Sequence, residues 1–573
     1  MLRQIPTLWL LIGLMFWGAA QDSSQLFPLE ALQPNVQGYA LTAAEGNLIE
    51  RFEVRVIALQ LNMVNGRPLI LVEASGELID KTGGVAAGMS GSPVYLPYEG
   101  DMRLVGAIGY AFPESDARLA LVTPFVDMQS VPFEGENSGV LASFGEEHFV
   151  GLGEARAIST PLLFNGVHGR AATMLEALLP DGVIQSLPIQ QQSVTFVDDD
   201  AFVLKPGSAI AVELIRGDIS LAAVGTLTHI EGEHFWAFGH PLLQREEVDF
   251  ALVPAYVTYI VPSSNVAFQL ANTGKRLLGT VSQDHAFAIA GTLVQEPNFL
   301  PISITMLIDD KTISKHIQVS NDERFLAELV EIASLQILDQ HFPSLSAGTV
   351  DIAWNIDLAD GQRLRMLEQI SNPEDIVAAS ASLSAEPFAI LANNMFKEAN
   401  IEKVGINLSY DPQQRIADIV KVEQDKEQVL EIGSTLRAFV RLQHYREDAE
   451  VIELQIPLPE ELSGIVDITF RGGSNGPPPE EDSEDDILSF EELLIALREQ
   501  TQSSELIVEA FVDGKNKRLL QKSYPFLVTG SENLEIELPF KEGEEPDGSS
   551  QEEDAPETSL PNDASKSSID ILE

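Results

Sequence analysis

The chain has 573 residues, of which 45% are hydrophobic, and carries 87 acidic against 35 basic residues, a net charge of −52. Such an acidic surface repels nucleic acid and anionic lipid, so partners of those two classes are disfavoured. The chain contains no Cys, which excludes disulfides, thiolate metal sites and a cysteine nucleophile. No phosphate loop, zinc-binding helix motif or dinucleotide fingerprint is present, so we expect neither a metal nor another cofactor.

The first twenty residues have the features of a secretory signal peptide. Arg3 supplies a positive charge, residues 7–17 form an apolar segment, and small residues at 18–20 precede a plausible cut at Gln21. The apolar segment is short for a membrane span, and an uncleaved anchor is the alternative. No other segment predicts a span, so after signal removal we expect a protein outside the cytoplasm, in the periplasm or the medium.

After a linker at 21–37, two β-rich units are expected at 38–145 and 146–300. Residues 52–57 alternate apolar and charged side chains, as a half-buried strand does. Short apolar runs separated by Gly and Pro continue through the second unit. Two successive units of many short strands predict a mainly β fold with two small barrels or sandwiches.

The later regions are predicted to differ from one another. Residues 301–400 form a mixed α/β region with a helix near 321–338, and residues 401–472 predict an immunoglobulin-like β sandwich. The C-terminal β domains are a candidate surface for a protein partner. The remaining segments are an acidic, Pro-rich linker at 473–488, a small α/β segment at 489–540 and an acidic disordered tail at 541–573.

The loop Gly88-Met89-Ser90-Gly91-Ser92-Pro93 carries the clearest chemical signal. A serine hydroxyl becomes a nucleophile when a base takes its proton and donors stabilise the resulting oxyanion. In trypsin-like enzymes two backbone N–H groups do this, on the nucleophile and on the residue two before it. Gly88 and Ser90 have that spacing, so Ser90 is the candidate nucleophile. A tight turn without chemistry is the alternative.

The candidate base is His240. None of the nine histidines precedes Ser90, so the order His, Asp, Ser is impossible within this chain. A later histidine can still serve, because geometry rather than chain order defines a triad. His240 lies between Gly239 and Pro241 at the end of the apolar run 235–238. A structural histidine at a strand end is the alternative.

The sequence resembles the SpoIVB-type serine peptidase family. That family carries Thr-Gly-Gly-Ile-Val-x-Gly-Met-Ser-Gly-Ser-Pro, close to residues 82–93 here, and residues 49–54 and 104–108 also match its pattern. Its histidine segment resembles residues 225–228 and 237–240, with the serine and histidine halves in swapped order. The resemblance covers roughly residues 38–295. It implies a two-barrel, trypsin-like core in which Ser90 and His240 are catalytic and Gly88 and Ser90 form the oxyanion hole.

The orienting acid of the triad is the point of departure. The family's catalytic Asp lies fifteen residues before the serine, and that position is Ser75 in this chain. Asp80 is the nearest acid in the same segment and our candidate, and Asp249 and Asp284 lie in the histidine half. Loss of the orienting acid lowers kcat of a serine protease by about 10⁴. A dyad, a relocated acid and an impaired enzyme all stay open.

Two functions follow from these patterns. The first is an exported serine endopeptidase that cleaves a protein or peptide substrate through Ser90 and His240. The second is a catalytically impaired relative that acts as an extracytoplasmic binding or scaffold protein. A hydrogen bond between Ser90 Oγ and His240 Nε2 would favour the enzyme.

Overall fold

The computed structural model describes residues 26–64, 66–112, 115–132, 155–165, 170–171, 173–174, 189–190, 199–263, 266–342, 346–475, 488–512 and 515–540. The predicted leader at 1–20, most of the acidic linker and the tail from residue 541 lie outside these ranges. The chain divides into two compact units. The first contains residues 1–415 and 487–500, and the second contains residues 416–486 and 501–573.

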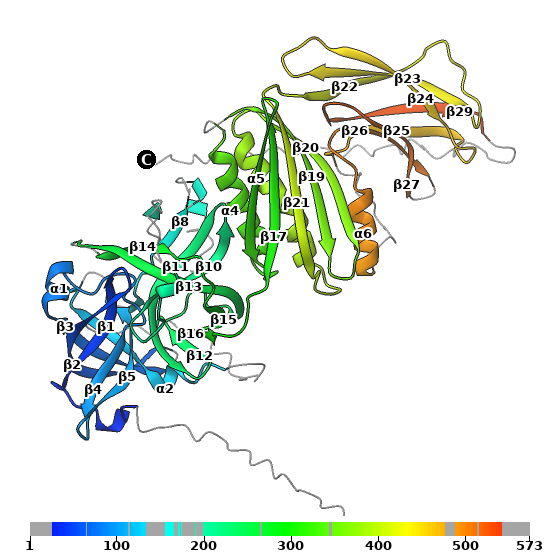
Figure 1. Cartoon of the computed structure of the whole chain (residues 1–573). Helices are drawn as coiled ribbons and strands as arrows, with labels where there is room; N and C mark the ends of the chain where they lie inside the picture. Colours follow the sequence, from blue (N-terminus) through cyan, green and yellow to red (C-terminus); the bar gives the residue numbers. More distant parts are fainter. Residues whose placement is uncertain are drawn as a thin grey trace, which may run out of the picture. The chain divides into compact units, whose positions relative to one another are not determined.

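A closed six-stranded barrel, barrel 1, begins the first unit (Figure 1). Its strand order is β4-β1-β2-β3-β6-β5, and β4 pairs with β5 to close it. Helix α1 (Glu77–Thr82) joins β3 to the loop before β4, and α2 (Phe125–Met128) follows β6. The strands are β1 (Gln37–Glu45), β2 (Leu48–Val64), β3 (Arg67–Ser75), β4 (Pro93–Tyr98), β5 (Asp101–Ala111) and β6 (Leu119–Pro124), with the short β7 (Arg156–Ala157) beside β5.

A second closed six-stranded barrel, barrel 2, has the order β10-β13-β15-β16-β12-β11, closed by pairing of β10 with β11. The two barrels confirm the predicted mainly β, two-barrel core. The strands of barrel 2 are β10 (Ala209–Gly217), β11 (Ser220–Glu231), β12 (His234–Ala237), β13 (Glu246–Val261), β15 (Gly279–His285) and β16 (Ala288–Thr292). The short strands β8 (Leu162–Asn165), β9 (Ile189–Gln190) and β14 (Phe268–Thr273) extend its sheet.

The sheet of barrel 2 continues into a mixed α/β layer. The end of β10 pairs with β18, and the order then runs β18-β17-β21-β19-β20, with β17 and β21 parallel. Helices α4 and α5 pack together against this sheet, and α6 packs on the edge strand β20. The elements are β17 (Phe299–Ile308), β18 (Lys311–Ser320), α4 (Leu326–Asp339), β19 (Gly348–Leu358), β20 (Arg363–Asn372), α5 (Ile376–Ala392), β21 (Ile401–Asp411) and α6 (Phe490–Glu499).

The second unit is a β sandwich of two four-stranded sheets that share one apolar core. Arg471 and Glu509 form a buried, bidentate ion pair in one of the sheets, with both nitrogen–oxygen distances at 2.9 Å. The strands are β22 (Ile416–Gln424), β23 (Thr435–His444), β24 (Glu450–Pro457), β25 (Gly464–Gly472), β26 (Glu505–Val512), β27 (Lys515–Ser523), β28 (Leu527–Thr529) and β29 (Ser531–Leu538).

Three predicted boundaries differ from this arrangement. Residues 401–411 form β21 inside the α/β layer, where they pair with β17 and β19, and therefore do not begin the sandwich. The sandwich extends past residue 472 and includes the strands from Glu505 to Leu538. The helix of the predicted 489–540 segment belongs to the first unit, because Phe490, Leu494 and Leu497 join its core. Pairing over long sequence separations, which local patterns do not encode, decides these boundaries.

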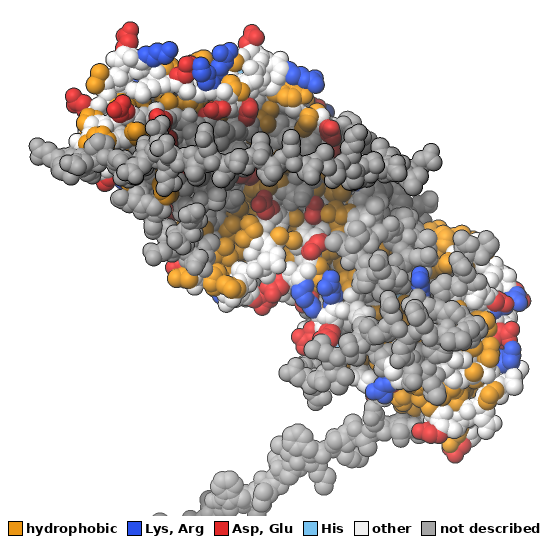
Figure 2. Space-filling view, turned by 180° about the vertical axis from the view of Figure 1, so that it is seen from behind, with side chains coloured by type: hydrophobic (Ala, Val, Ile, Leu, Met, Phe, Trp, Pro, Cys, Tyr) orange, Lys and Arg blue, Asp and Glu red, His pale blue; other side chains and the backbone are white. Residues whose placement is uncertain are grey.

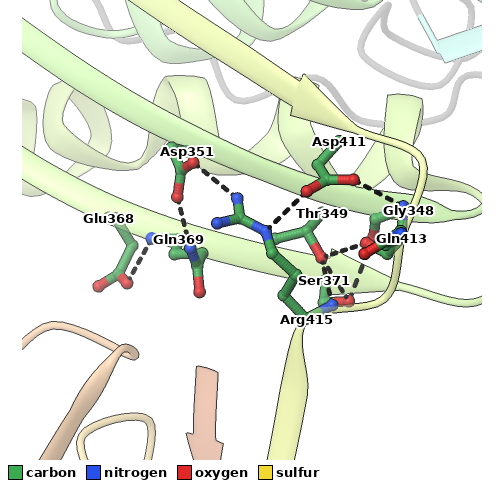
Figure 3. A network of polar contacts seen from close by, with 9 residues as sticks. All are labelled: Gly348, Thr349, Asp351, Glu368, Gln369, Ser371, Asp411, Gln413 and Arg415. Carbon is green, nitrogen blue, oxygen red and sulfur yellow. Dashed lines mark hydrogen bonds and ion pairs between the residues drawn. The ribbon is translucent and has the colours of Figure 1, made fainter. Parts of the chain in front are cut away.

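Arg415, the last residue of the first unit before the chain crosses to the second, is held by polar contacts (Figure 3). Its backbone N–H donates to Thr349 Oγ1 at 2.9 Å, and its guanidinium donates to Asp351 Oδ2 at 2.7 Å. Gln369 donates to the other oxygen of Asp351. These contacts fix the exit of the chain from the α/β layer.

On the face shown in Figure 2, Lys and Arg side chains are interspersed with Asp and Glu over the described surface. Within the described ranges, no helix is both long and apolar enough to cross a lipid bilayer.

The two barrels pack through small side chains. Along β10, β11 and β13, alternate residues point into barrel 2, and the residues between them join the core of barrel 1. Small side chains let the two backbones approach closely. The residues that face barrel 1 are Ala209, Ala211, Ala222, Val224, Ala251 and Val253.

Glycine makes the approach closer at one point of this seam. A Cβ atom on Gly109 of β5 would lie 2.2 Å from the carbonyl oxygen of Gly239, which follows β12. Because the opposing atom is backbone, a side chain at residue 109 would have to push the barrels apart.

We predict that Gly109→Ala destabilises the first unit by about 1–3 kcal/mol through this overpacking. The matched control is Gly405→Ala in β21, where the nearest atom to a new Cβ is 3.9 Å away. Urea unfolding followed by tryptophan fluorescence measures both, since Trp236 and Trp354 lie in the first unit. Equal stability of the two variants would contradict the close packing of the barrels.

Candidate active site

The Ser90 loop lies between α1 and β4 and is folded into two tight turns. The N–H of Met89 donates to Ala86 O, and the N–H of Ser92 donates to Met89 O, both at 3.0 Å. Gly88 and Gly91 have φ angles of +94° and +93°, a region that residues with a Cβ rarely adopt. These two glycines therefore place Ser90 at the tip of a sharply bent backbone.

Strand β11 of barrel 2 binds this loop through its backbone and two threonines. The N–H of Thr226 donates to Ser90 O at 2.8 Å, and Thr226 Oγ1 donates to Gly88 O at 3.0 Å. Thr228 Oγ1 donates to Gly91 O at 2.8 Å. A Cβ on Gly91 would lie 1.9 Å from Thr226 O, so the contact requires glycine there. The nucleophile loop of barrel 1 is thus fixed by barrel 2.

The turn that carries His240 is anchored at the same point. The N–H of Phe238 donates to Thr226 O at 3.3 Å, so the Thr226 backbone contacts both the Ser90 loop and the His240 turn. From barrel 1, Thr123 Oγ1 donates to Gly239 O at 2.6 Å.

Phe238 has a φ of +68°, which is an outlier for a bulky residue. Such backbone strain costs about 1–3 kcal/mol and clusters at functional sites. The Phe238 ring is accommodated because Gly225 has no side chain: a Cβ there would lie 2.4 Å from a ring carbon. The strained turn places His240 three residues after the end of β12.

Ser90 and His240 are both completely buried. Among the described residues, neither Ser90 Oγ nor His240 Nε2 has a hydrogen-bond partner, so the two side chains do not bond to each other. A buried hydroxyl or ring nitrogen without a partner costs about 1–3 kcal/mol. The structure brings both side chains to the seam between the barrels without the hydrogen bond expected of an assembled Ser/His pair.

His240 has the protonation state that a general base needs. Its Nδ1 lies 2.6 Å from the carbonyl oxygen of Pro241. A carbonyl oxygen only accepts, so Nδ1 carries the hydrogen and Nε2 keeps its lone pair. Burial lowers the pKa of His240 to about 4, and the hydrogen bond to Pro241 partly opposes this shift. The imidazole is therefore neutral at pH 7.

The two amides expected to form the oxyanion hole stand out from their neighbours. The N–H groups of Ala87, Met89 and Gly91 each donate to a backbone carbonyl. In the described part of the chain, those of Gly88 and Ser90 have no acceptor. The side chain of Gln269 lies close to Gly88, whose Cβ would be 2.6 Å from Gln269 Oε1. That oxygen also has no partner in the described part of the chain.

The acids named from the sequence lie in different places. Asp80 is exposed on α1, where it accepts a hydrogen bond of 2.9 Å from Arg118. Ser75 is exposed at the end of β3. Asp249 accepts from the backbone N–H of Asn298 at 2.8 Å. None of these three residues contacts the Nδ1 atom of His240, whose hydrogen-bond partner is the Pro241 carbonyl.

Asp284 of β15 is the acid next to the His240 turn. It is fully buried, and its two carboxylate oxygens accept from the N–H groups of Leu242 and Leu243, both at 2.6 Å. Burial raises the pKa of Asp284 to about 6, while the amides of residues 242–245 lower it. Asp284 therefore holds the backbone directly after His240, and it does not contact the imidazole itself.

Sequence reasoning missed the roles of Thr226, Thr228 and Gln269. The two threonines belong to the Gly225-Thr226-Leu227-Thr228 stretch, whose resemblance to the family's histidine segment was the available signal. Nothing in the local sequence marks Gln269. It comes close to Gly88 because its neighbour Phe268 pairs with Ala87 in a bridge between distant parts of the chain. The described residues contain no group of three His, Cys, Asp or Glu side chains placed to hold a metal ion.

A family model matches part of the chain. No curated protein and no solved structure matches the chain. A family model described as SpoIVB peptidase S55 matches residues 29–118, which include the Ser90 loop and end well before His240. With the two closed barrels, this match confirms the resemblance to the SpoIVB-type serine peptidase family over the segment that carries the Ser90 loop.

Proposed function

We propose that this chain is an exported serine endopeptidase in a closed form, with Ser90 as nucleophile and His240 as general base. The observation that carries the proposal is the pair of buried atoms without partners, Ser90 Oγ and His240 Nε2, at the seam between the barrels. Buried polar atoms are nearly always paired in folded proteins, so such exceptions need an explanation. Reactive atoms kept for a substrate are one such explanation.

The proposed reaction follows the general serine peptidase scheme. Ser90 Oγ attacks the carbonyl carbon of the scissile peptide bond while His240 Nε2 takes its proton. The oxyanion that forms is bound by the N–H groups of Gly88 and Ser90, which donate to no other acceptor among the described residues. The protonated His240 then gives its proton to the leaving amine, and water releases the acyl group from Ser90 by the same route.

The closed form limits access to this site. Ser90 and His240 are both 0% exposed, so a polypeptide substrate reaches them only after the local structure opens. Opening has to bring Nε2 within hydrogen-bond distance of Oγ, a rearrangement that substrate binding drives in many enzymes. We infer that the substrate is a protein or peptide, and that export depends on the leader at residues 1–20.

The complete burial of Ser90 and His240 also favours a second candidate function. A relative that has lost catalysis would keep the barrel fold and bury a serine and a histidine without assembling them. Ser75, at the position of the family's acid, is consistent with such a loss. In that case the protein binds partners outside the cytoplasm, with the β sandwich of the second unit as the candidate surface.

A fluorophosphonate probe separates the two functions. We expect the probe to label the wild-type chain and to stop labelling in Ser90→Ala, because the probe reacts only with an activated serine. Ser92→Ala is the matched control, since Ser92 is equally buried, lacks a partner among the described residues and lies two positions away. Labelling that persists in Ser90→Ala, or a wild-type chain that no condition labels, would favour the binding protein.

The neutral state of His240 can be tested through stability. Its pKa is lowered in the folded state, so the unfolded state binds more protons between about pH 6.5 and 4. The stabilisation that a neutral His240 provides is complete above that window and is lost as the pH falls through it.

We expect the stability difference between wild type and His240→Asn to shrink by roughly 3 kcal/mol from pH 7 to pH 4. The difference between the two proteins is needed, because Asp284, with its raised pKa, changes stability in the opposite direction in both. Urea unfolding followed by tryptophan fluorescence measures it. A difference that does not vary with pH would show that His240 titrates normally.

A further inference from the structure

We propose that Asp284 is the orienting acid of His240 and that it acts through one intervening peptide group, as a positioning residue. The proposal rests on the proposed role of His240 as base. In the family, an Asp at the position of Ser75 orients the histidine. In this chain Asp284 takes that role, without direct contact between its carboxylate and the imidazole.

The contacts form a continuous chain of hydrogen bonds. His240 Nδ1–H donates to Pro241 O at 2.6 Å. The Pro241 carbonyl and the Leu242 N–H belong to the same planar peptide group, and in a trans peptide they point in opposite directions. On the far side, the Leu242 N–H donates to Asp284 Oδ1 at 2.6 Å. The order is therefore imidazole, peptide, carboxylate.

A carboxylate at the end of this chain affects the imidazole in two ways. It fixes the orientation of the peptide plane, and with it the direction in which Pro241 O accepts from the ring. Its negative charge also polarises the peptide, because hydrogen bonds in series strengthen one another in a low-dielectric site. Both effects favour the tautomer with hydrogen on Nδ1, and both stabilise the imidazolium that forms during catalysis.

The surrounding backbone is shaped around the carboxylate. The N–H groups of Leu242 and Leu243 donate to the two carboxylate oxygens, and the amides of residues 244 and 245 also lower the pKa of Asp284, as backbone N–H groups turned toward an anion do. Gln244 has a φ of +56° and Glu246 a φ of +62°, so two non-glycine residues hold strained conformations in this turn. Among the described residues no ion pair involves Asp284, and the backbone N–H groups of Leu242 and Leu243 bind its carboxylate.

Other charged groups lie near Asp284 and matter for its titration. Glu246 is its partner on β13, Glu247 follows it, and His285 is the next residue on β15. Burial lowers the pKa of His285. The partner of Asp284 on β16 is the uncharged Ile289, and Arg245 in the turn contributes an amide. Any test by pH has to separate Asp284 from His285.

The first test is Asp284→Asn. The amide oxygen of Asn can accept from one of the two N–H groups, while its NH₂ group faces the other N–H and repels it. We expect the ¹⁵N ring signals of His240 to shift, and the rate of Ser90 labelling by the fluorophosphonate to fall about 10–100-fold. This is the loss seen when a partner behind a metal-bound histidine is removed, and it is smaller than the loss of about 10⁴ for an acid bonded directly to the imidazole. The ring signals are assigned by their loss in His240→Gln.

Asp249→Asn is the matched control. Asp249 is a partly buried acid on β13 of the same barrel that accepts from a backbone N–H, that of Asn298, and has no contact with the His240 turn. It should leave both readouts unchanged. A folded Asp284→Asn protein with wild-type His240 ring signals would overturn the proposal, because a carboxylate that only stabilises the fold would not move those signals.

The wild-type protein provides a second test that does not depend on the variant folding. Protonation of Asp284 should move the His240 ring signals near pH 6, above the titration of the ring itself near pH 4. The inflection should persist in His285→Gln, and its absence would overturn the proposal. If wild-type Ser90 is never labelled while the ring signals still respond to Asp284, the peptidase function fails and the coupling stands.

Discussion

The backbone of Thr226 holds the candidate site together. Its N–H binds the carbonyl of Ser90 and its carbonyl binds the N–H of Phe238, so one residue of barrel 2 fixes both halves of the proposed catalytic pair. This is possible only because Gly91 and Gly109 have no side chains and the facing strands present alanine. The site therefore depends on how closely two backbones approach.

Because the site depends on the contact between the barrels, the serine can precede the histidine along the chain, the reverse of their order in the family that the sequence resembles. The two side chains come from different barrels, and their relation is set at the seam rather than by a loop that joins them. Either barrel can come first in the sequence as long as the seam is preserved. The position of the proposed orienting acid is also set by the fold and not by nearness in sequence. Asp284 lies on a strand of barrel 2 and binds the backbone after His240 within that barrel.

The sequence predicted the parts of this protein that local patterns encode. Alternating strands, the glycine-rich serine loop and the helix near 321–338 could be recognised because each depends on neighbouring residues. The relation between Asp284 and His240 could not, because forty-four positions separate them and the contact passes through backbone. Likewise, β21 could not be separated from the sandwich, since its partners β17 and β19 are chosen by the packing of the whole sheet.

The position of α6 has a consequence for folding. The chain leaves the sandwich after β25, supplies α6 to the edge of the first unit, and returns to the sandwich at β26. Phe490, Leu494 and Leu497 belong to the core of the first unit, so that core is complete only when residue 500 is available. For a chain synthesised from its N-terminus, the barrels emerge long before the edge of their sheet is covered. The first unit is therefore the first to start folding, and it cannot finish before much of the second has emerged.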